Sequence, residues 1–71
     1  MRWKPADLDR LERAIDEGAR VQLSRRGTEY VILPRELRIE GTTEVILAVH
    51  PNTGLEMKFP LDEIDGFSVI Y

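Results

Sequence analysis

The chain has 71 residues, no cysteine and a net charge of −3, from ten Lys and Arg against thirteen Asp and Glu. A chain of this length has room for one hydrophobic core, so residues 1–71 are expected to form a single domain. The lack of cysteine excludes disulfides and thiolate-bound zinc, and 42% apolar with 32% charged residues excludes wholesale disorder.

No apolar stretch reaches the length of a signal peptide or a membrane-spanning helix, which favours a cytoplasmic protein without membrane contact. The charge is unevenly shared along the chain. Residues 1–26 carry seven Lys and Arg against five Asp and Glu, whereas residues 27–71 carry three against eight. Because nucleic-acid affinity depends strongly on the neutralisation of phosphates, the acidic balance counts against a nucleic-acid partner.

Residues 5–17 are expected to form the only helix. Leu8, Leu11 and Ile15 fall on one face at helical spacing. Gly18 follows the last periodic residue and can adopt the left-handed conformation that commonly ends a helix.

Residues 19–71 switch to the two-residue periodicity of strands, in the runs "ARVQLSR", "EYVILP", "ELRIE", "EVILAVH", "LEMKF" and "FSVIY". The run "EVILAVH" is the most apolar, which predicts that it is the most central strand. The alternation of "ELRIE" predicts that Leu37 and Ile39 face the core. Pro34 cannot donate to a strand ladder, so it marks a strand end, an edge or a bulge.

One helix and about five antiparallel strands joined by short turns are typical of a small SH3-like barrel, here over residues 19–71. In this fold "FSVIY" pairs with an early strand and closes the barrel, while the helix caps one open end. Trp3 is expected to pack its indole across the barrel on which it docks. An open antiparallel sheet with the helix on one face is the alternative fold.

The chain resembles the barrel part of WYL domains at two places. Pro34 and Leu37 match a Pro-x-x-Leu at a strand end, and "FPLDEI" from Phe59 to Ile64 matches a Phe-x-Leu-Asp-x-Ile closing element. The namesake triplet is replaced by Val45–Leu47, of which only the leucine is kept. The resemblance implies the barrel fold and a nucleic-acid or nucleotide ligand, although the acidic "PLDEID" lacks the basic residues that such ligands require.

The order of one helix and five strands is also similar to Sm-like proteins, which share the barrel and assemble into rings. That resemblance implies RNA binding and ring formation, but the Asp-x-x-Met-Asn type of RNA-contacting motif is absent from this sequence.

The residues with chemical potential do not form a catalytic pattern. His50 is the only histidine and precedes Pro51, so we interpret it as a turn residue. The acidic group of Asp62, Glu63 and Asp65, with Glu56 nearby, lacks the spacing of an EF-hand and is interpreted as a local cap with solvated neighbours. We therefore expect no catalytic residue, no metal and no cofactor, and hence no enzyme.

Two groups of residues are candidates for binding. Arg20, Arg25, Arg26 and Tyr30 are a possible contact for an anion or a nucleic acid, because guanidinium groups at a hairpin tip grip phosphate and tyrosine offers a stacking face. A charged tip that keeps the hairpin soluble is the structural alternative.

The second group consists of Pro34, Leu37 and Ile39, a possible sheet edge for strand pairing. The sequence thus favours a non-enzymatic module that binds another protein or its own copy, with a homodimer as one form. A WYL-like or Sm-like nucleic-acid or nucleotide-binding module is the alternative function.

Overall fold

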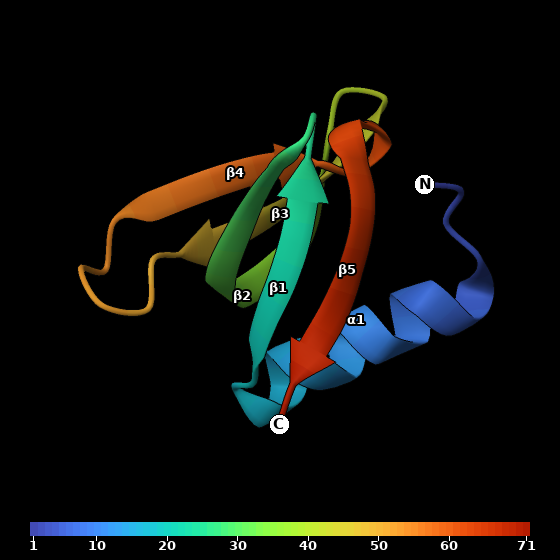
Figure 1. The fold of residues 1–71 in the computed structure, drawn as a ribbon. Helices are drawn as coiled ribbons and strands as arrows, with labels where there is room; N and C mark the ends of the chain where they lie inside the picture. Colours follow the sequence, from blue (N-terminus) through green and yellow to red (C-terminus); the bar gives the residue numbers. More distant parts are fainter.

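The computed structural model describes all residues 1–71 as one helix followed by five strands (Figure 1). The elements in chain order are α1 (Pro5–Glu17), β1 (Arg20–Arg25), β2 (Thr28–Glu40), β3 (Thr43–Val49), β4 (Glu56–Pro60), the short 3₁₀ helix η1 (Leu61–Glu63) and β5 (Ile64–Ile70). Every strand pairing is antiparallel. The expected helix and five antiparallel strands are confirmed.

The strands form one sheet in the order β4-β3-β2-β1-β5, which remains open. β5 pairs with β1 as expected, from Ile70 opposite Arg20 to Ile64 opposite Arg25. No ladder joins β5 to β4, so the expected closure of a barrel does not occur and the sheet matches the open alternative. β4 ends at Pro60, which has no N–H to donate, and η1 then directs the chain away from β4 toward β1.

β2 is the central strand of the sheet and belongs to both of its halves. Its first part pairs with β1 as far as Ile32, and its second part pairs with β3 from Leu33 onward. The register shifts between Pro34 and Glu36, so Pro34 marks a bulge inside one continuous strand of 13 residues. The prediction that "EVILAVH" is the most central strand was wrong, because this run forms β3, which lies beside the central strand β2.

The apolar character of β3 has another cause, since side chains cover both of its faces. Ile46 and Ala48 face the core. On the outer face, Lys58 of β4 reaches over β3 to Glu40 of β2, with Nζ 3.0 Å from the carboxylate oxygens. Lys58 lies opposite Leu47 and Glu40 opposite Thr43, so the bridge crosses β3 at Val45, which is 3% exposed.

The core lies between α1 and the concave side of the bent sheet. It contains residues of α1, of all five strands and of η1: Leu11, Ala14, Val21, Leu23, Ile32, Ile46, Ala48, Phe59, Leu61 and Ile64. Leu37 packs against this cluster while half-buried, but Ile39 is 69% exposed. The expectation that Ile39 faces the core was wrong, because it lies opposite Glu44 near the end of the β2–β3 hairpin, beyond the core residues of both strands.

Trp3 fixes the segment before α1 against β5 and η1. Its indole stacks on the ring of Phe67 with centroids 5.0 Å apart, and its Nε1–H donates to the carbonyl oxygen of Leu61 at 2.9 Å. The guanidinium of Arg10 lies 4.9 Å from the centroid of the same Phe67 ring. The expected packing of Trp3 on the sheet is confirmed.

Replacing Trp3 by Ala is expected to lower the free energy of unfolding by about 2 kcal/mol, below the range for a fully buried Trp because the indole is half-buried. Denaturant titration of the variant measures the loss. Arg2→Ala is the control, since Arg2 is exposed. Equal stability of the Trp3 variant and the wild type would show that the segment does not dock.

The amino terminus of α1 is stabilised by Asp7. Its carboxylate accepts the backbone N–H of Lys4 at 3.0 Å and pairs with Arg10 at 2.8 Å. These two interactions, the backbone hydrogen bond first, hold the pKa of Asp7 below its ordinary value of 3.8. Because the folded state lowers this pKa, Asp7 stabilises the protein above pH 3.8 and loses that effect as pH falls through the lowered value.

Asp7→Asn is therefore expected to be less stable than the wild type at about pH 7, and this deficit should shrink toward about pH 2 as the wild-type carboxyl takes up its proton. Thermal unfolding at both pH values checks this expectation. Asp16→Asn, near the other end of α1, should not lower stability at pH 7. A stability deficit of Asp7→Asn that is as large at about pH 2 as at about pH 7 would contradict this interpretation.

Candidate functional site

The tip of the β1–β2 hairpin carries the charged residues that the sequence singled out. Arg26 and Gly27 form a two-residue turn with φ angles of 49° and 81°. Arg25 closes the hairpin opposite Thr28. The turn holds Arg25 half-buried and leaves Arg26 exposed.

Both arginines of the tip are paired with Glu63 of η1. Nε and Nη2 of Arg25 lie 2.8 Å and 2.6 Å from Oε1 of Glu63, and Nη2 of Arg26 lies 3.7 Å from Oε2. The Arg25 guanidinium also lies 5.9 Å from the ring centroid of Phe59. An incoming anion would therefore compete with Glu63, which reduces the capacity of this tip to bind phosphate.

Tyr30 contacts the same ring from the other strand of the hairpin. It meets Phe59 edge to face, with centroids 5.2 Å apart and an angle of 62°. Arg20 lies at the opposite end of β1, five residues from Arg25, or roughly 16 Å along a strand. The structure thus brings Arg25, Arg26 and Tyr30 together around Glu63 and Phe59, and it separates Arg20 from them.

Sequence reasoning missed Glu63 as the partner of the arginines. It treated the acidic group as a local cap with solvated neighbours, because the separation of 38 positions between Arg25 and Glu63 hides their proximity. The observed contact follows from the pairing of β5 with β1, which places Ile64 opposite Arg25.

Glu63→Gln is expected to lower the free energy of unfolding by about 1 kcal/mol, because it removes a charge from an ion pair in which two Arg25 nitrogens contact Oε1 and which is only partly shielded from water. Chemical denaturation at low and high salt measures this, and the deficit should shrink at high salt. Arg26→Ala, which removes an exposed and longer contact, should cost less than about 0.5 kcal/mol. Equal losses for both variants would contradict the assignment of Arg25 as the main partner.

Pro34, Leu37 and Ile39 lie in the central strand rather than at either end of the sheet. Pro34 is buried, Leu37 is half-buried and Ile39 is exposed. β3 pairs with one side of this segment, and no strand pairs with the other side after Ile32. α1 lies next to that side and lines a shallow hollow of about 370 Å³ together with Arg35, Glu36 and Leu37.

The histidine and the acidic residues take part in local structure. Nδ1 of His50 accepts the backbone N–H groups of Asn52 and Thr53 at 3.1 Å and 3.3 Å, which stabilises the β3–β4 turn. No three of the His, Asp and Glu side chains are grouped so that they could hold a metal ion. α1 is neither long enough nor apolar enough to cross a membrane.

No family model matches the chain, and a search of curated proteins finds no match.

Proposed function

We propose that this chain is a non-enzymatic binding module that associates with a second copy of itself through the outer edge of β5. The observation that carries the proposal is the open sheet, in which β5 pairs with β1 on one side only. An unpaired strand presents a row of N–H and C=O groups that a second strand can satisfy.

The register shows which backbone groups of β5 are available. In a two-residue hairpin the residues on either side of the turn exchange main-chain hydrogen bonds. The N–H and C=O groups of Arg25, and of every second residue of β1 before it, therefore point toward β2. The alternate residues of β1 point toward β5 and bond with Gly66, Ser68 and Ile70. The main-chain groups of Phe67 and Val69 therefore point outward.

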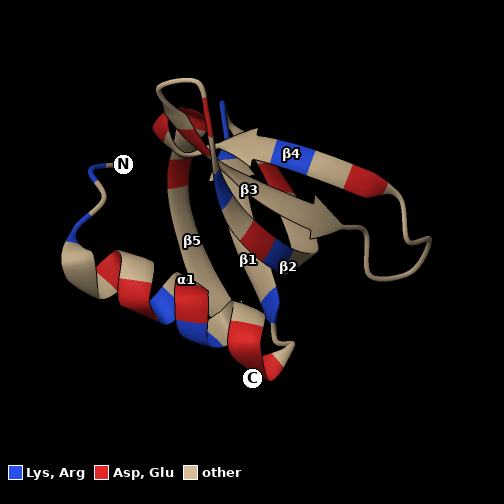
Figure 2. Cartoon of the chain, turned by 180° about the vertical axis from the view of Figure 1, so that it is seen from behind, with Lys and Arg blue, Asp and Glu red and all other residues tan.

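The side chains along this edge permit pairing. Residues 66–71 carry no charge, and β5 shows a single acidic position near its start in Figure 2. Ile70 is 41% and Tyr71 87% exposed at the end of this segment. The opposite edge, β4, carries Glu56, Lys58 and Pro60, which are residue types that protect an edge against pairing.

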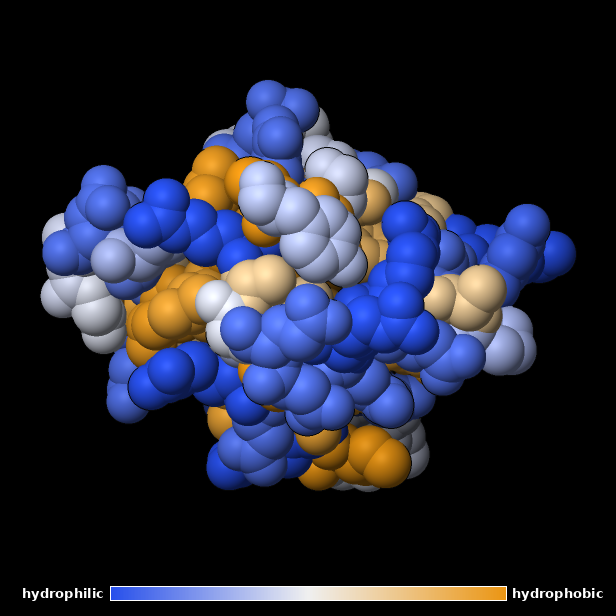
Figure 3. All heavy atoms as spheres, turned by 90° about the horizontal axis from the view of Figure 1, so that it is seen from below, coloured by the Kyte–Doolittle hydropathy of each residue, from blue (hydrophilic) through white to orange (hydrophobic).

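Association through a broad apolar face has less support than association through the β5 edge. On the side of the molecule seen in Figure 3, the apolar atoms form separate groups divided by hydrophilic side chains. Strand pairing needs no such face, because main-chain hydrogen bonds supply most of the contact.

The nucleic-acid alternative has less support. Glu63 already pairs with Arg25 and Arg26, and Arg20 lies at the far end of β1. Phosphate binding draws on several unpaired cations in one patch, which this arrangement does not provide.

Ser68→Lys is the direct test, because it places a charge in the middle of the proposed edge, where two copies meet. We expect the wild type to form a dimer in sedimentation velocity and light scattering, and Ser68→Lys to weaken it roughly tenfold or more through like-charge repulsion. Gln22→Lys is the matched control, since Gln22 is opposite Ser68 but lies one strand inward. A strictly monomeric wild type, or equal weakening by both lysines, would refute the proposal.

A further inference from the structure

The first part of β2 has a second side that no strand occupies. Val49 is the last residue of β3 in the ladder with β2, opposite Leu33. His50 then donates its N–H to Leu55 at 2.8 Å and its carbonyl accepts the N–H of Gly54 at 2.9 Å, so the chain turns toward β4. Pro51 follows, and it has no N–H with which it could continue the ladder.

Two residues of β2 are left with unpaired main-chain groups as a result. The hairpin turn makes Arg25 and Thr28 a hydrogen-bonded pair, so the main-chain groups that point toward β1 are those of Thr28, Tyr30 and Ile32. Glu29 and Val31 therefore direct their N–H and C=O groups to the other side. A second observation leads to the same assignment. The main-chain N–H of His50 bonds with Leu55, so the main-chain groups of the preceding residue, Val49, point the other way, toward Leu33 of β2. The main-chain groups of Leu33, and of every second residue of β2 before it, therefore point away from β1.

These unpaired groups face a groove of about 280 Å³. Glu29, Tyr30 and Val31 line one wall, and the turn residues His50, Pro51 and Asn52 line the other. Val31 is 44% exposed, although it belongs to the central strand of the sheet.

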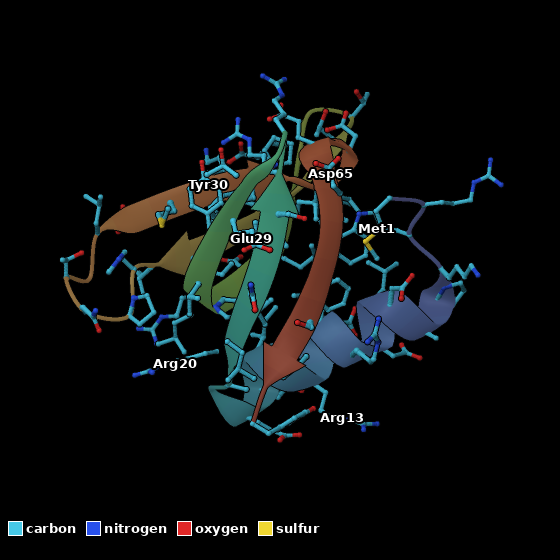
Figure 4. All side chains as sticks on the ribbon, in the orientation of Figure 1. Met1, Arg13, Arg20, Glu29, Tyr30 and Asp65 are labelled. Carbon is cyan, nitrogen blue, oxygen red and sulfur yellow. The ribbon has the colours of Figure 1, made fainter.

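The groove has a positive and a negative end. Arg20 precedes Val21, which pairs with Ile32, and its long side chain lines the groove together with Val31. Glu29 lies two residues earlier in β2, toward the hairpin tip. Neither Arg20 nor Glu29 forms an ion pair within the chain. Figure 4 shows Arg20 near the start of β1, below the β3–β4 turn, and Glu29 and Tyr30 farther toward the hairpin tip.

We propose that this groove binds an extended peptide segment of another protein as an added strand, antiparallel to β2. The peptide continues the register of β3, so its main chain hydrogen-bonds with Val31 and then with Glu29. An acidic residue opposite Val31 faces Arg20, and a basic residue two positions later faces Glu29. The site uses a different edge from the β5 association, so either proposal can fail alone.

The probes are two blocked pentapeptides of equal composition. Acetyl-Thr-Asp-Thr-Lys-Thr-amide carries the complementary charge order, and acetyl-Thr-Lys-Thr-Asp-Thr-amide carries the reverse. Titrated into the full chain, the first peptide should shift the amide NMR signals of Glu29 and Val31 in a saturable way. It should bind roughly threefold more tightly than the second, as expected for two partly exposed charge pairs.

Exchanging the two charges of the protein tests the orientation. The double variant Arg20→Glu with Glu29→Lys should invert the preference between the peptides. The double variant Arg13→Glu with Glu17→Lys, which exchanges two exposed charges of α1, is the control and should keep the wild-type preference. Ser68→Lys should leave peptide binding unchanged, since it alters only the β5 edge.

Three outcomes would overturn the inference. The first is the absence of saturable shifts at Glu29 and Val31 with either peptide. The second is a preference that the Arg20 and Glu29 exchange does not invert. The third is a set of shifts centred on β4 or β5, which would assign peptide binding to another edge.

Discussion

The fold depends on one strand that serves both halves of the sheet. β2 is 13 residues long, and it changes partner from β1 to β3 between Ile32 and Leu33. The bulge between Pro34 and Glu36 follows immediately and bends the strand. Because both half-sheets share this strand, their inner faces meet in one core, which no open flat sheet of 71 residues could enclose.

The same bend determines where the sheet is left unpaired. Each half of β2 uses one side for its own partner strand, so the other side of each half stays open. Near η1, Trp3 joins the segment before α1 to the first part of β5, because it bonds to Leu61 while it stacks on Phe67. The protein is thus a small core with several short edges, and its proposed functions follow from those edges rather than from a catalytic cluster.

Local features of the fold were predictable from the sequence. The helix at Pro5–Glu17 follows from apolar spacing, and its end follows from Gly18, which adopts a φ of 66°. Pro34 indicated a strand end, an edge or a bulge because a missing N–H acts locally, and the structure has the bulge. Apart from the pairing of the last strand with an early one, features that depend on strand order were not predictable, since order is decided by contacts between distant segments.

Three cases show this limit. The exposure of Ile39 depends on how far the β2–β3 hairpin extends beyond the core. The apolar run of β3 reflects the cover that Lys58 and Glu40 provide from neighbouring strands, which periodicity does not record. For the candidate site, the sequence identified Arg25 and Arg26 but not Glu63, and it identified a free edge but not which strands carry one.

Amide hydrogen exchange along β2 tests the shared bent strand most directly. We expect an alternating pattern in the first half, with slow exchange at Tyr30 and Ile32 and fast exchange at Glu29 and Val31. Arg38, which bonds to β3 in the second half, should again exchange slowly. Uniformly slow exchange at all five residues would mean that another strand occupies the open side of β2, and would contradict the account.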